Sequence, residues 1–481
     1  MTDKADYKKL GLKSGIEIHQ QLDTNKLFCS CPSLLRAEEP DIIARRKLNA
    51  VAGEEGKIDI AAEHEHKKER EFIYQGYSDS TCEVEFDESP PHEINQEALR
   101  IALQISLLLN AKPLEIVQIM RKTVIDGSNT SGFQRTLLIA KDGWIETSSG
   151  KIGIQNICLE EDAARIISQN ENQATYRLDR LGIPLVEIAT MPEIKNPEQA
   201  KEVALHIGEI LRACKVKRGI GTIRQDVNMS IAGGKRIEIK GVQEPSLISK
   251  TIETEIERQI ALVKNKKSTE EVRKANPDGT TSYLRPLPGR ARMYPETDLP
   301  LVKISRDMVN EAKRTLPKLK HELREELHAH GLNPELTKLI LGENKLEEYK
   351  ELLAIHNNPD LIAKLLVLYP KDIASHEKIS SEEINKKITI DIKEEILQQV
   401  KAKKISEAQV RQIMLDIVKG KSIQEALKIE KSSSEELEHE IQNLLKEKPN
   451  LTINAYMGLL MQTHKGISGK EIIEILKKYV K

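Results

Sequence analysis

Hydrophobic and polar residues alternate along two segments of the chain, one near its start and one near its middle. In residues 15–22 apolar and ionisable side chains follow one another in the order Ile16, Glu17, Ile18 and His19. Successive side chains of an extended strand point to opposite faces, so this order predicts a strand with one apolar and one ionisable face. A solvated face usually carries Lys, Thr and scattered charge, so repeated acids beside a histidine indicate a bound cation.

A second alternating segment, residues 225–243, predicts a β-hairpin. Its apolar positions are Val227, Met229 and Ile231 before the turn, and Ile237 and Ile239 after it. The glycine pair at 233–234 supplies the tight reversal that a hairpin needs. The opposite face of this hairpin then carries Asp226, Asn228, Glu238 and Lys240.

The rest of the first part mixes helical and strand-like patterns. Asn95 and Asn196 are predicted N-caps of two helices that cover one side of a sheet. The run 183–189 predicts a strand in which Glu187 interrupts apolar residues. The segment 263–282 is polar and lysine-rich and contains Asn-Pro-Asp-Gly, so it predicts a loop.

After about Pro300 the pattern is helical almost throughout. Ser406 and Ser422 each begin a predicted capping box, and a last helix is expected from Gly469 onwards. We therefore predict an α+β fold with three parts, which are a sheet-based body over 1–300, a helical domain over 301–400 and a small helical tail over 401–481.

Composition narrows the class of protein. The chain has 481 residues, of which 39% are hydrophobic and 31% charged, so it should hold several domains in a soluble protein. A net charge of -1 excludes a global positive field, and 3% aromatic residues argue against a stacking platform for unpaired bases. The charged N-terminus, the lack of an apolar span and an odd count of five cysteines favour a reducing, cytoplasmic location without membrane contact.

Residues 126–136 are rich in Gly, Ser and Asn and follow two cations, Arg121 and Lys122. Such a loop lets the backbone approach a ligand, and the cations suit phosphate groups. The spacing and the missing terminal lysine exclude a Walker A loop. An ordinary surface turn is an equally good interpretation.

Further acids stand in strand-like sequence. Glu161 ends a run with alternating apolar residues, and Glu187 lies in the next such run. If folding gathers Glu17, Glu161, Glu187, Asp226 and Glu238, the repulsion between their charges would destabilise the fold unless a divalent cation compensates for it. Magnesium is the natural candidate, since carboxylates hold it together with substrate phosphates. Taken singly, each acid is more often solvated or salt-bridged.

Three cysteines predict a possible zinc site. Cys29 and Cys31 are spaced as half of a thiolate site, and Cys82 offers a third ligand. The fourth ligand is not evident from the sequence, although His92 is a candidate. Ordinary buried thiols are the more frequent interpretation of such cysteines.

Longer stretches carry a resemblance. Residues 15–24, 120–136, 159–163, 179–188, 218–228, 285–289 and 294–298 resemble motifs of the tRNA-dependent amidotransferase B/E family, and most closely those of its archaeal-type E subunits. The tail segments 456–461 and 466–469 look like the family's C-terminal helical domain. Ordered motifs of this length are far more specific than any single spacing.

The resemblance implies a fold and a reaction. The fold would be an antiparallel-sheet cradle, a glutamine-synthetase-like kinase domain, followed by the helical domain and a tRNA-binding tail. ATP would phosphorylate the side chain of glutamate on tRNA(Gln), and ammonia would then displace phosphate to give Gln-tRNA(Gln). The ammonia would come from a glutaminase partner, the family's D subunit or another amidase, in a heterotetramer or larger complex. Tail lysines that would meet the RNA backbone are Lys419, Lys421, Lys465 and Lys470.

The resemblance also implies site residues. Magnesium would be held by His19, Glu161 and Glu187, and a second cation by Glu17, Asp226 and Glu238. Arg121 and Lys122 would act beside these catalytic residues. ATP or phosphate contacts are expected from Ser128, Asn129, Thr130, Gln134 and Lys240.

One departure from the family pattern concerns 263–276. The E subunit usually carries an inserted domain there that resembles part of aspartyl-tRNA synthetase, and this chain has only a short polar stretch. The compact layout is therefore also similar to that of the B subunit. Two other functions stay open at this point, a non-catalytic tRNA-binding scaffold and a carboxylate–amine ligase for a small molecule.

Overall fold

The computed structural model describes residues 6–47, 70–124, 126–287, 293–428, 434–448, 452–463 and 469–479. The chain divides into two compact units, Met1–Leu319 and Lys320–Lys481. The sequence placed the change to helices at about Pro300, but helix α5 (Arg306–Arg314) belongs to the first unit. Ala312 of this helix is fully buried in the first unit's core, which explains the later boundary.

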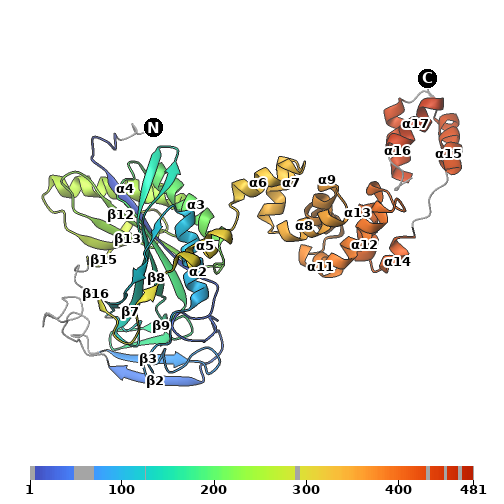
Figure 1. Ribbon diagram of the computed structural model, residues 1–481. Helices are drawn as coiled ribbons and strands as arrows, with labels where there is room; N and C mark the ends of the chain where they lie inside the picture. The colour runs from blue at the N-terminus through green and yellow to red at the C-terminus, as the bar shows by residue number, and fades with distance from the viewer. Residues whose placement is uncertain are drawn as a thin grey trace. The chain divides into compact units, whose positions relative to one another are not determined.

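The first unit is built on an eleven-stranded sheet in the described residues (Figure 1). Its strand order is β15-β14-β13-β12-β1-β11-β8-β7-β6-β16, with β4 paired to β7. Neighbouring strands are antiparallel except β13 and β14, which are parallel. The strands are β1 (Lys13–Gln21), β4 (Lys112–Pro113), β6 (Ile119–Thr123), β7 (Phe133–Thr147), β8 (Gly150–Glu161), β11 (Pro184–Thr190), β12 (Ile223–Ser230), β13 (Ile237–Lys240), β14 (Glu271–Ala275), β15 (Thr281–Pro286) and β16 (Met293–Pro295).

Two smaller sheets complete the strands. A four-stranded sheet has the order β2-β3-β10-β9, and β17 pairs with β5. The tyrosines and phenylalanines of the four-stranded sheet form a separate core with Leu178 and Leu181. The bounds are β2 (Ile42–Lys47), β3 (Glu71–Gly76), β9 (Arg165–Gln169), β10 (Gln173–Arg177), β5 (Ile116–Val117) and β17 (Val302–Lys303).

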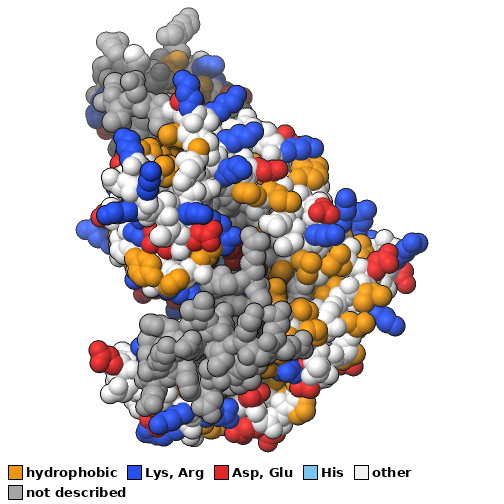
Figure 2. Space-filling model, turned by 90° about the vertical axis from the view of Figure 1, so that its left-hand side faces the viewer, with side chains coloured by type: hydrophobic (Ala, Val, Ile, Leu, Met, Phe, Trp, Pro, Cys, Tyr) orange, Lys and Arg blue, Asp and Glu red, His pale blue; other side chains and the backbone are white. Residues whose placement is uncertain are grey.

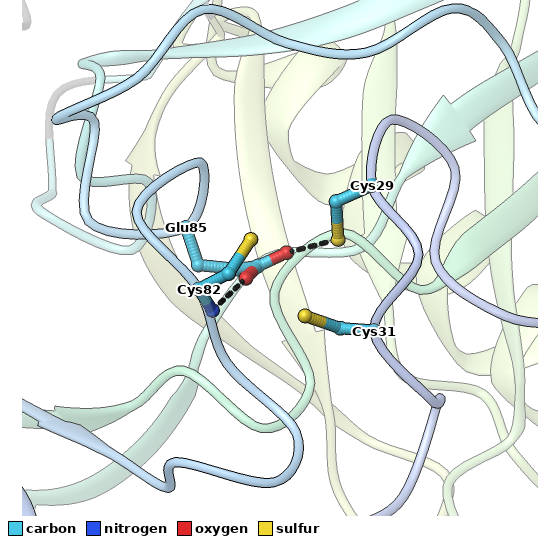
Figure 3. Close-up of side chains that lie close together, drawn as sticks. All are labelled: Cys29, Cys31, Cys82 and Glu85. Atoms are coloured by element: carbon cyan, nitrogen blue, oxygen red, sulfur yellow. Dashed lines mark hydrogen bonds between the residues drawn. The ribbon is translucent and has the colours of Figure 1, made fainter.

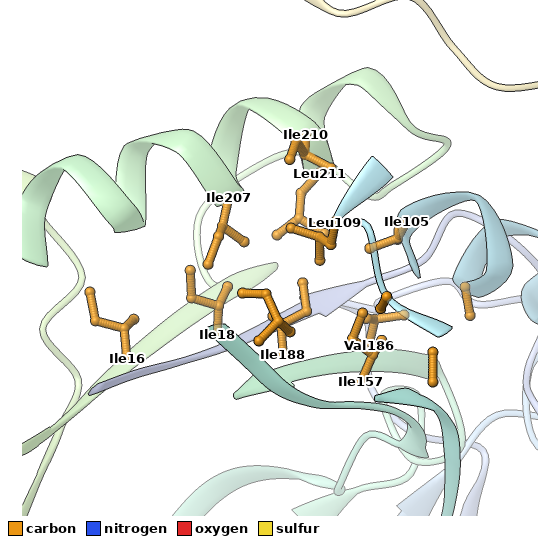
Figure 4. Packing of buried hydrophobic residues seen from close by; sticks show 14 of the residues in the cluster. Ile16, Ile18, Ile105, Leu109, Ile157, Val186, Ile188, Ile207, Ile210 and Leu211 are labelled. Atoms are coloured by element: carbon orange, nitrogen blue, oxygen red, sulfur yellow. The ribbon is translucent and has the colours of Figure 1, made fainter. Parts of the chain in front are cut away.

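Helices α2 (Gln96–Leu108), α3 (Pro197–Ala213) and α4 (Pro245–Lys264) pack on the apolar face of the large sheet. The predicted caps are confirmed, because the Asn95 and Asn196 side chains accept backbone N–H groups of the first turn. Figure 4 shows Ile207, Ile210 and Leu211 of α3 above the strand residues of this face. The predicted alternation in β1 is confirmed as well, since Ile16 and Ile18 are buried in the same core.

The hairpin of β12 and β13 has the predicted alternation of apolar and polar positions. Val227 lies opposite Ile239, Asn228 opposite Glu238 and Met229 opposite Ile237. The chain reverses through Gly233, whose φ of 74° favours glycine. One face of the hairpin therefore joins the core, and the other carries its polar side chains.

The segment 263–282 is not the loop that the sequence predicted. It contains β14 and the start of β15, which extend the large sheet. Two of its charged residues, Glu271 and Arg273, are buried: Arg273 Nη1 lies 3.2 Å from Glu271 Oε1, and Arg258 Nη2 of α4 lies 2.7 Å from the same oxygen. Because buried ion pairs look like solvated charge in a sequence, the polar composition concealed a strand.

The second unit is helical throughout its described residues. One core involves α6 to α14, and a separate core joins α15, α16 and α17. The predicted capping boxes at Ser406 and Ser422 are both present. The elements are α6 (Lys320–Ala329), α7 (Pro334–Gly342), α8 (Leu346–Ile355), α9 (Pro359–Ala363), η1 (Lys364–Leu368), α10 (Tyr369–Glu377), α11 (Ser381–Lys387), α12 (Ile390–Lys401), η2 (Glu407–Gln409), α13 (Val410–Val418), α14 (Ile423–Ala426), α15 (Ser434–Glu447), α16 (Ile453–Thr463) and α17 (Gly469–Tyr479).

The surface carries charge of both signs. On the face shown in Figure 2, Lys and Arg side chains are intermingled with Asp, Glu and hydrophobic side chains. Among the described helices, none combines the length and the hydropathy needed to cross a membrane.

Candidate functional site

The polar face of the large sheet gathers ionisable residues from six strands, β1, β6, β8, β11, β12 and β13. Strand pairing sets His19 of β1 opposite Glu187 of β11, and Glu17 of β1 opposite Asp226 of β12. Directly opposed side chains of an antiparallel pair lie about 5 Å apart at Cβ. Residues that are up to 209 positions apart are thus neighbours, as the sequence hypothesis required.

His19 stands at the centre of a tight group. Its Nε2 lies 3.2 Å from Glu187 Oε2 and 3.5 Å from Glu17 Oε1. One ligand atom from each of these three residues lies within 4.8 Å of the others, which is a separation that one metal ion can bridge. The structure therefore brings Glu17, His19 and Glu187 together.

Glu160 extends this group on β8. Lys122 Nζ lies 3.1 Å from Glu160 Oε1 and 3.5 Å from Glu187 Oε2, so one lysine joins both acids. Thr136 Oγ1 donates to Glu160 at 2.9 Å, and Gln134 Nε2 donates at 3.1 Å. Lys122 and Gln134, both predicted from the sequence, lie on this face.

The electrostatics of the group follow from burial and crowding. Burial and then the negative charge of Glu187 raise the pKa of Glu17 to about 7. Burial opposes ionisation of Glu187, but its hydrogen bond with His19 and the charge of Lys122 hold the pKa of Glu187 well below its usual range. Burial likewise works to lower the pKa of His19, but the bond to Glu187 and the surrounding acids outweigh it and raise that pKa. The site is short of positive charge.

A second set of acids lies beside the first. Lys240 Nζ is 2.8 Å from Asp226 Oδ2 and 2.7 Å from Glu238 Oε1. The backbone N–H of Gly241 donates to the other Asp226 oxygen at 3.0 Å. The predicted residues Asp226, Glu238 and Lys240 are therefore adjacent, with the lysine between the two acids.

Two of the predicted residues on the strands lie elsewhere. Glu161 follows Glu160 and Arg121 precedes Lys122, so both point to the opposite face of their strands. Glu161 Oε2 accepts the Arg135 backbone N–H at 3.1 Å and faces the Arg135 guanidinium at 3.5 Å. Arg121 pairs with Glu296 and lies 3.1 Å from Asp298 Oδ2. The structure does not bring Glu161 or Arg121 into the acid group.

A β-bulge explains the placement of Glu161. Ile152 and Ile154 are buried in the core, and so are Ile157 and Leu159. Three positions separate Ile154 from Ile157, whereas a regular strand points every second residue to the same face. The register of β8 against β11 shifts between Ile154 and Asn156. A bulge inserts one residue and turns every later side chain to the other face. Glu160, rather than Glu161, therefore lies on the face that carries Glu17, His19 and Glu187.

Glu296 lies at the centre of a polar cluster that it forms with Arg121, Arg135 and Asp298. This cluster should make the stability of the fold depend on pH. Burial would raise the pKa of Glu296, but hydrogen bonds from Arg121 and the Asp298 backbone, with the charge of Arg135, lower it to about 2. Its ionised form therefore stabilises the fold above pH ~4.5, and this contribution is lost as the pH falls towards 2. Glu296→Gln should cost about 3 kcal/mol at pH 7 and less than half of that at pH 3.

Urea unfolding of both forms at the two pH values checks this expectation. Glu202→Gln is the matched control, because the hydrogen bonds of the Glu202 side chain within the described residues are those with the exposed Ser148. It should change the free energy of unfolding little at either pH. An equal loss at pH 7 and pH 3 for Glu296→Gln would contradict the proposed ion cluster.

The loop residues predicted to contact a cofactor lie at the four-stranded sheet. Tyr74 Oη donates to Gly127 O at 2.8 Å, and a Cβ at Gly127 would lie 2.2 Å from the Phe72 ring. Ser128 Oγ donates to Asp126, Thr130 Oγ1 donates to Glu85 O, and Asn129 is buried. The side chain of Ser128 is therefore bound within its own loop and that of Thr130 to the turn that carries Glu85, rather than to the acid group.

Three cysteines and one acid form a further group (Figure 3). Cys29, Cys31, Cys82 and Glu85 each offer a ligand atom within 4.8 Å of the others. Cys29 Sγ donates to Glu85 Oε1 at 2.8 Å, and the fully buried Lys26 lies 3.6 Å from that oxygen. A hydrogen bond from Cys29 lowers the pKa of Cys31 to about 7. Glu85 is therefore the fourth candidate ligand, where the sequence suggested His92. His92 is exposed and lies outside the group.

Comparison with known proteins decides the family. The model of the GatB/GatE catalytic domain matches residues 12–310. The chain belongs to the GatB/GatE family. This result confirms the resemblance, and the family is one of amidotransferases.

Relatives in the GatB/GatE family align along most of the chain. A Methanocaldococcus jannaschii protein, named as the E subunit of glutamyl-tRNA(Gln) amidotransferase, is 37% identical over 634 positions, covering 99% of both chains. Proteins of the same name from Methanococcus maripaludis and Pyrococcus horikoshii are 35% and 38% identical, covering 99% and 81% of this chain and 99% and 84% of their own lengths.

The alignment also bears on the missing insertion. It spans 634 positions, whereas this chain has 481 residues, so a substantial part of the GatB/GatE relative has no counterpart here.

The residues that sequence reasoning missed are Glu160, Glu85, Arg135 and Glu296. The spacing Cys82-x-x-Glu85 was the one available signal for the fourth ligand in the cysteine group.

Proposed function

We propose that this chain is the ATP-dependent amidating component of a tRNA-dependent amidotransferase that converts Glu-tRNA(Gln) to Gln-tRNA(Gln). Membership in the GatB/GatE family supports this assignment, as do relatives named as the E subunit of glutamyl-tRNA(Gln) amidotransferase. The observation that carries the proposal is the group of Glu17, His19 and Glu187 on one face of the sheet. A scaffold without catalysis would gain nothing from crowding acids in this way.

The donor set of this face fits magnesium. Three acids, Glu17, Glu160 and Glu187, crowd around one imidazole and one lysine, and burial together with this negative charge raises the pKa of Glu17. His19 and Glu187 would hold one Mg²⁺ with Glu17 or Glu160, and Asp226 with Glu238 would serve a second position. Bound magnesium would neutralise charge on the phosphoryl group during its transfer.

The residues of the chain would support two steps. First, a carboxylate oxygen of the glutamyl side chain forms a bond to the γ-phosphorus of ATP, and the bond to the β-phosphate oxygen breaks, which leaves an acyl phosphate and ADP. Lys122 offers its positive charge to the moving phosphoryl group. Second, ammonia forms a bond to the carbonyl carbon, phosphate leaves, and the nitrogen loses a proton to solvent.

The remaining parts of the chain complete the proposal. The large sheet would form the cradle of a kinase domain over 1–300, the helical domain would follow over 301–400, and the tail over 401–481 would bind tRNA. Lys419 and Lys421 of this tail pair with Glu377 and Asp416, and Lys465 lies outside the described residues. A glutaminase partner, the family's D subunit or another amidase, would supply ammonia.

A defined assay tests this function. The purified chain receives Glu-tRNA(Gln), ATP, Mg²⁺ and ammonium chloride, which replaces the glutaminase partner. Gln-tRNA(Gln) should form with one ADP per amide, and omission of ATP or Mg²⁺ should stop the reaction. The proposal falls if no ATP-dependent conversion occurs, or if ATP hydrolysis responds to free glutamate instead of charged tRNA.

The cysteine group is proposed as a structural zinc site. Zn²⁺ prefers four tetrahedral ligands of thiolate, imidazole or carboxylate type, and Cys29, Cys31, Cys82 and Glu85 supply such a set. The low pKa of Cys31 favours the thiolate that a metal needs. The protein purified from zinc-containing medium should carry one zinc per chain, measured by elemental analysis. Cys82→Ser should lose it, and the matched Cys214→Ser, which changes a buried thiol outside the group, should retain it.

A further inference from the structure

The three sulfur atoms of the cysteine group are close enough to react with one another. Cys29 and Cys31 lie on one loop and Cys82 on another, and their side chains are turned towards one another (Figure 3). The three sulfurs lie within 4.8 Å of one another, and all five cysteines of the chain are free thiols. Neighbouring thiols are joined by oxidation when an oxidant reaches one of them.

The members of the group differ in exposure. Cys29 and Glu85 are buried, at 7% and 3% exposed, whereas Cys31 and Cys82 are partly exposed. Cys29 is also held by a partner, since its Sγ donates to Glu85 Oε1 at 2.8 Å. Oxidants act on the sulfur atoms that solvent reaches. Cys31 and Cys82 are therefore the pair of thiols in this group that is open to oxidation.

The charge of the group is balanced within the chain. Glu85 Oε1 lies 3.6 Å from Nζ of the fully buried Lys26, and Glu85 Oε2 accepts the Cys82 backbone N–H at 2.7 Å. Lys26 is fixed in turn, because its Nζ donates to Leu178 O at 3.1 Å. A buried carboxylate without such partners would be strongly destabilising. Because Glu85 has them, the fold can tolerate a change in the chemistry of the two accessible thiols.

The segment that carries Cys31 is linked to the end of β8, next to the acid group. The backbone N–H of Leu27 donates to Gly182 O at 2.8 Å, and the N–H of Gly182 donates to Asp162 O at 3.0 Å. Asp162 stands two positions after Glu160, which lies 3.1 Å from Lys122 in the acid group. A rearrangement of the cysteine segment therefore reaches Glu160 through two backbone hydrogen bonds.

We propose that Cys31 and Cys82 are a redox-sensitive pair, which hydroperoxides convert reversibly to a disulfide. In the first step the Cys31 sulfur attacks a peroxide oxygen, so that an S–O bond forms and the O–O bond breaks. The leaving oxygen takes the thiol proton and departs as water or an alcohol. In the second step the Cys82 sulfur attacks the Cys31 sulfur, an S–S bond forms, the S–O bond breaks, and the hydroxide leaves as water with the Cys82 proton. The two thiols lose two electrons, which the peroxide gains.

The redox pair goes beyond the proposed function, and only its effect on amidation rests on that function. After oxidation Cys29 and Glu85 are the two ligands that remain, which is too few for a structural zinc site. Oxidation should therefore release zinc. It should also slow amidation about tenfold, because the displaced segment is joined to the strand end that follows Glu160. A thiol reductant with added zinc should restore both properties.

Peroxide treatment of the full chain tests the pair. After treatment with hydrogen peroxide, the remaining thiols are blocked with iodoacetamide, and the unreduced digest is analysed by mass spectrometry. The expected product is a peptide pair that links Cys31 to Cys82, formed with one peroxide per linkage and cleaved by dithiothreitol. A chelating dye should record zinc release in step with the linkage.

Variants sharpen the test. Cys31→Ser and Cys82→Ser should each abolish the linkage. Cys214→Ser is the matched control, because it removes a buried thiol outside the group, and it should form the linkage as the wild type does. The map of the wild-type protein is decisive by itself, since it requires no variant to fold. The inference is overturned if Cys31 and Cys82 stay reduced, if either is linked to Cys29 instead, or if Cys31 reaches the sulfinic acid without a linkage.

Failure of the redox pair differs from failure of the other proposals. A protein that forms the linkage but does not amidate Glu-tRNA(Gln) keeps the redox pair and loses the function. A protein that amidates Glu-tRNA(Gln) and forms no linkage loses the redox pair and keeps the function. A chain that purifies without zinc and still links Cys31 to Cys82 refutes the zinc site alone.

Discussion

Glu187→Gln is expected to lower the kcat for ATP-dependent conversion of Glu-tRNA(Gln) about a thousandfold while leaving tRNA affinity unchanged. Glu187 is the residue that touches both His19 and Lys122, at 3.2 Å and 3.5 Å. The amide keeps the size of the side chain and an acceptor oxygen for His19, but it removes the charge that would hold magnesium. The loss should therefore fall on the chemical step, since the tail over 401–481 is the part proposed to bind the tRNA body.

Single-turnover amidation with ammonium chloride as nitrogen donor measures this effect without the partner glutaminase. Glu193→Gln is the matched control: Glu193 lies shortly after the same strand, is exposed, and accepts the Gly153 N–H. It should retain nearly full activity, and both variants should unfold at the temperature of the wild type. A Glu187→Gln enzyme within tenfold of the wild type would refute the role of the acid group.

Glu160→Gln and Glu161→Gln should separate catalysis from stability at neighbouring positions. Glu160 faces Lys122 and the acid group, so its variant should fold normally and lose about a hundredfold in kcat. Glu161 is buried against Arg135, so its variant should lose about 2–3 kcal/mol of stability because the guanidinium loses one of its two acids. Its kcat below the melting temperature should stay within a few-fold of the wild type.

Urea unfolding and single-turnover amidation on the same preparations give both quantities. Each variant serves as the control of the other, because the substitution is the same and the positions are adjacent. The reverse result, with catalysis lost at Glu161 and stability lost at Glu160, would mean that β8 presents its other face to the substrate and that the site lies near Arg135.

Much of the site was predictable because its strands alternate regularly. In β1 and in the hairpin of β12 and β13, one face is apolar at every second position, so the other face follows by geometry. Cross-strand pairing then brought His19 to Glu187. The zinc hypothesis was harder, since Glu85 comes from a turn, and turn residues have no periodicity that indicates where they point.

Other features were concealed by paired charges. Arg273 and Glu271 made β14 look like a solvated loop, although each neutralises the other within the sheet. Arg121 looked like a partner of the neighbouring Lys122, yet adjacent residues of a strand face opposite sides. Arg121 is instead committed to Glu296 and Asp298.

The sequence by itself determined the family, the strands that carry the acids and the face to which those acids point, because alternation and long motifs are properties of local order. Only the tertiary structure decided which of Glu160 and Glu161 faces that site. One extra residue in β8, at the bulge before Asn156, turns the rest of the strand over. The position of such a bulge depends on how β8 pairs with β11 and packs on the core, and these contacts come from residues far away in the chain.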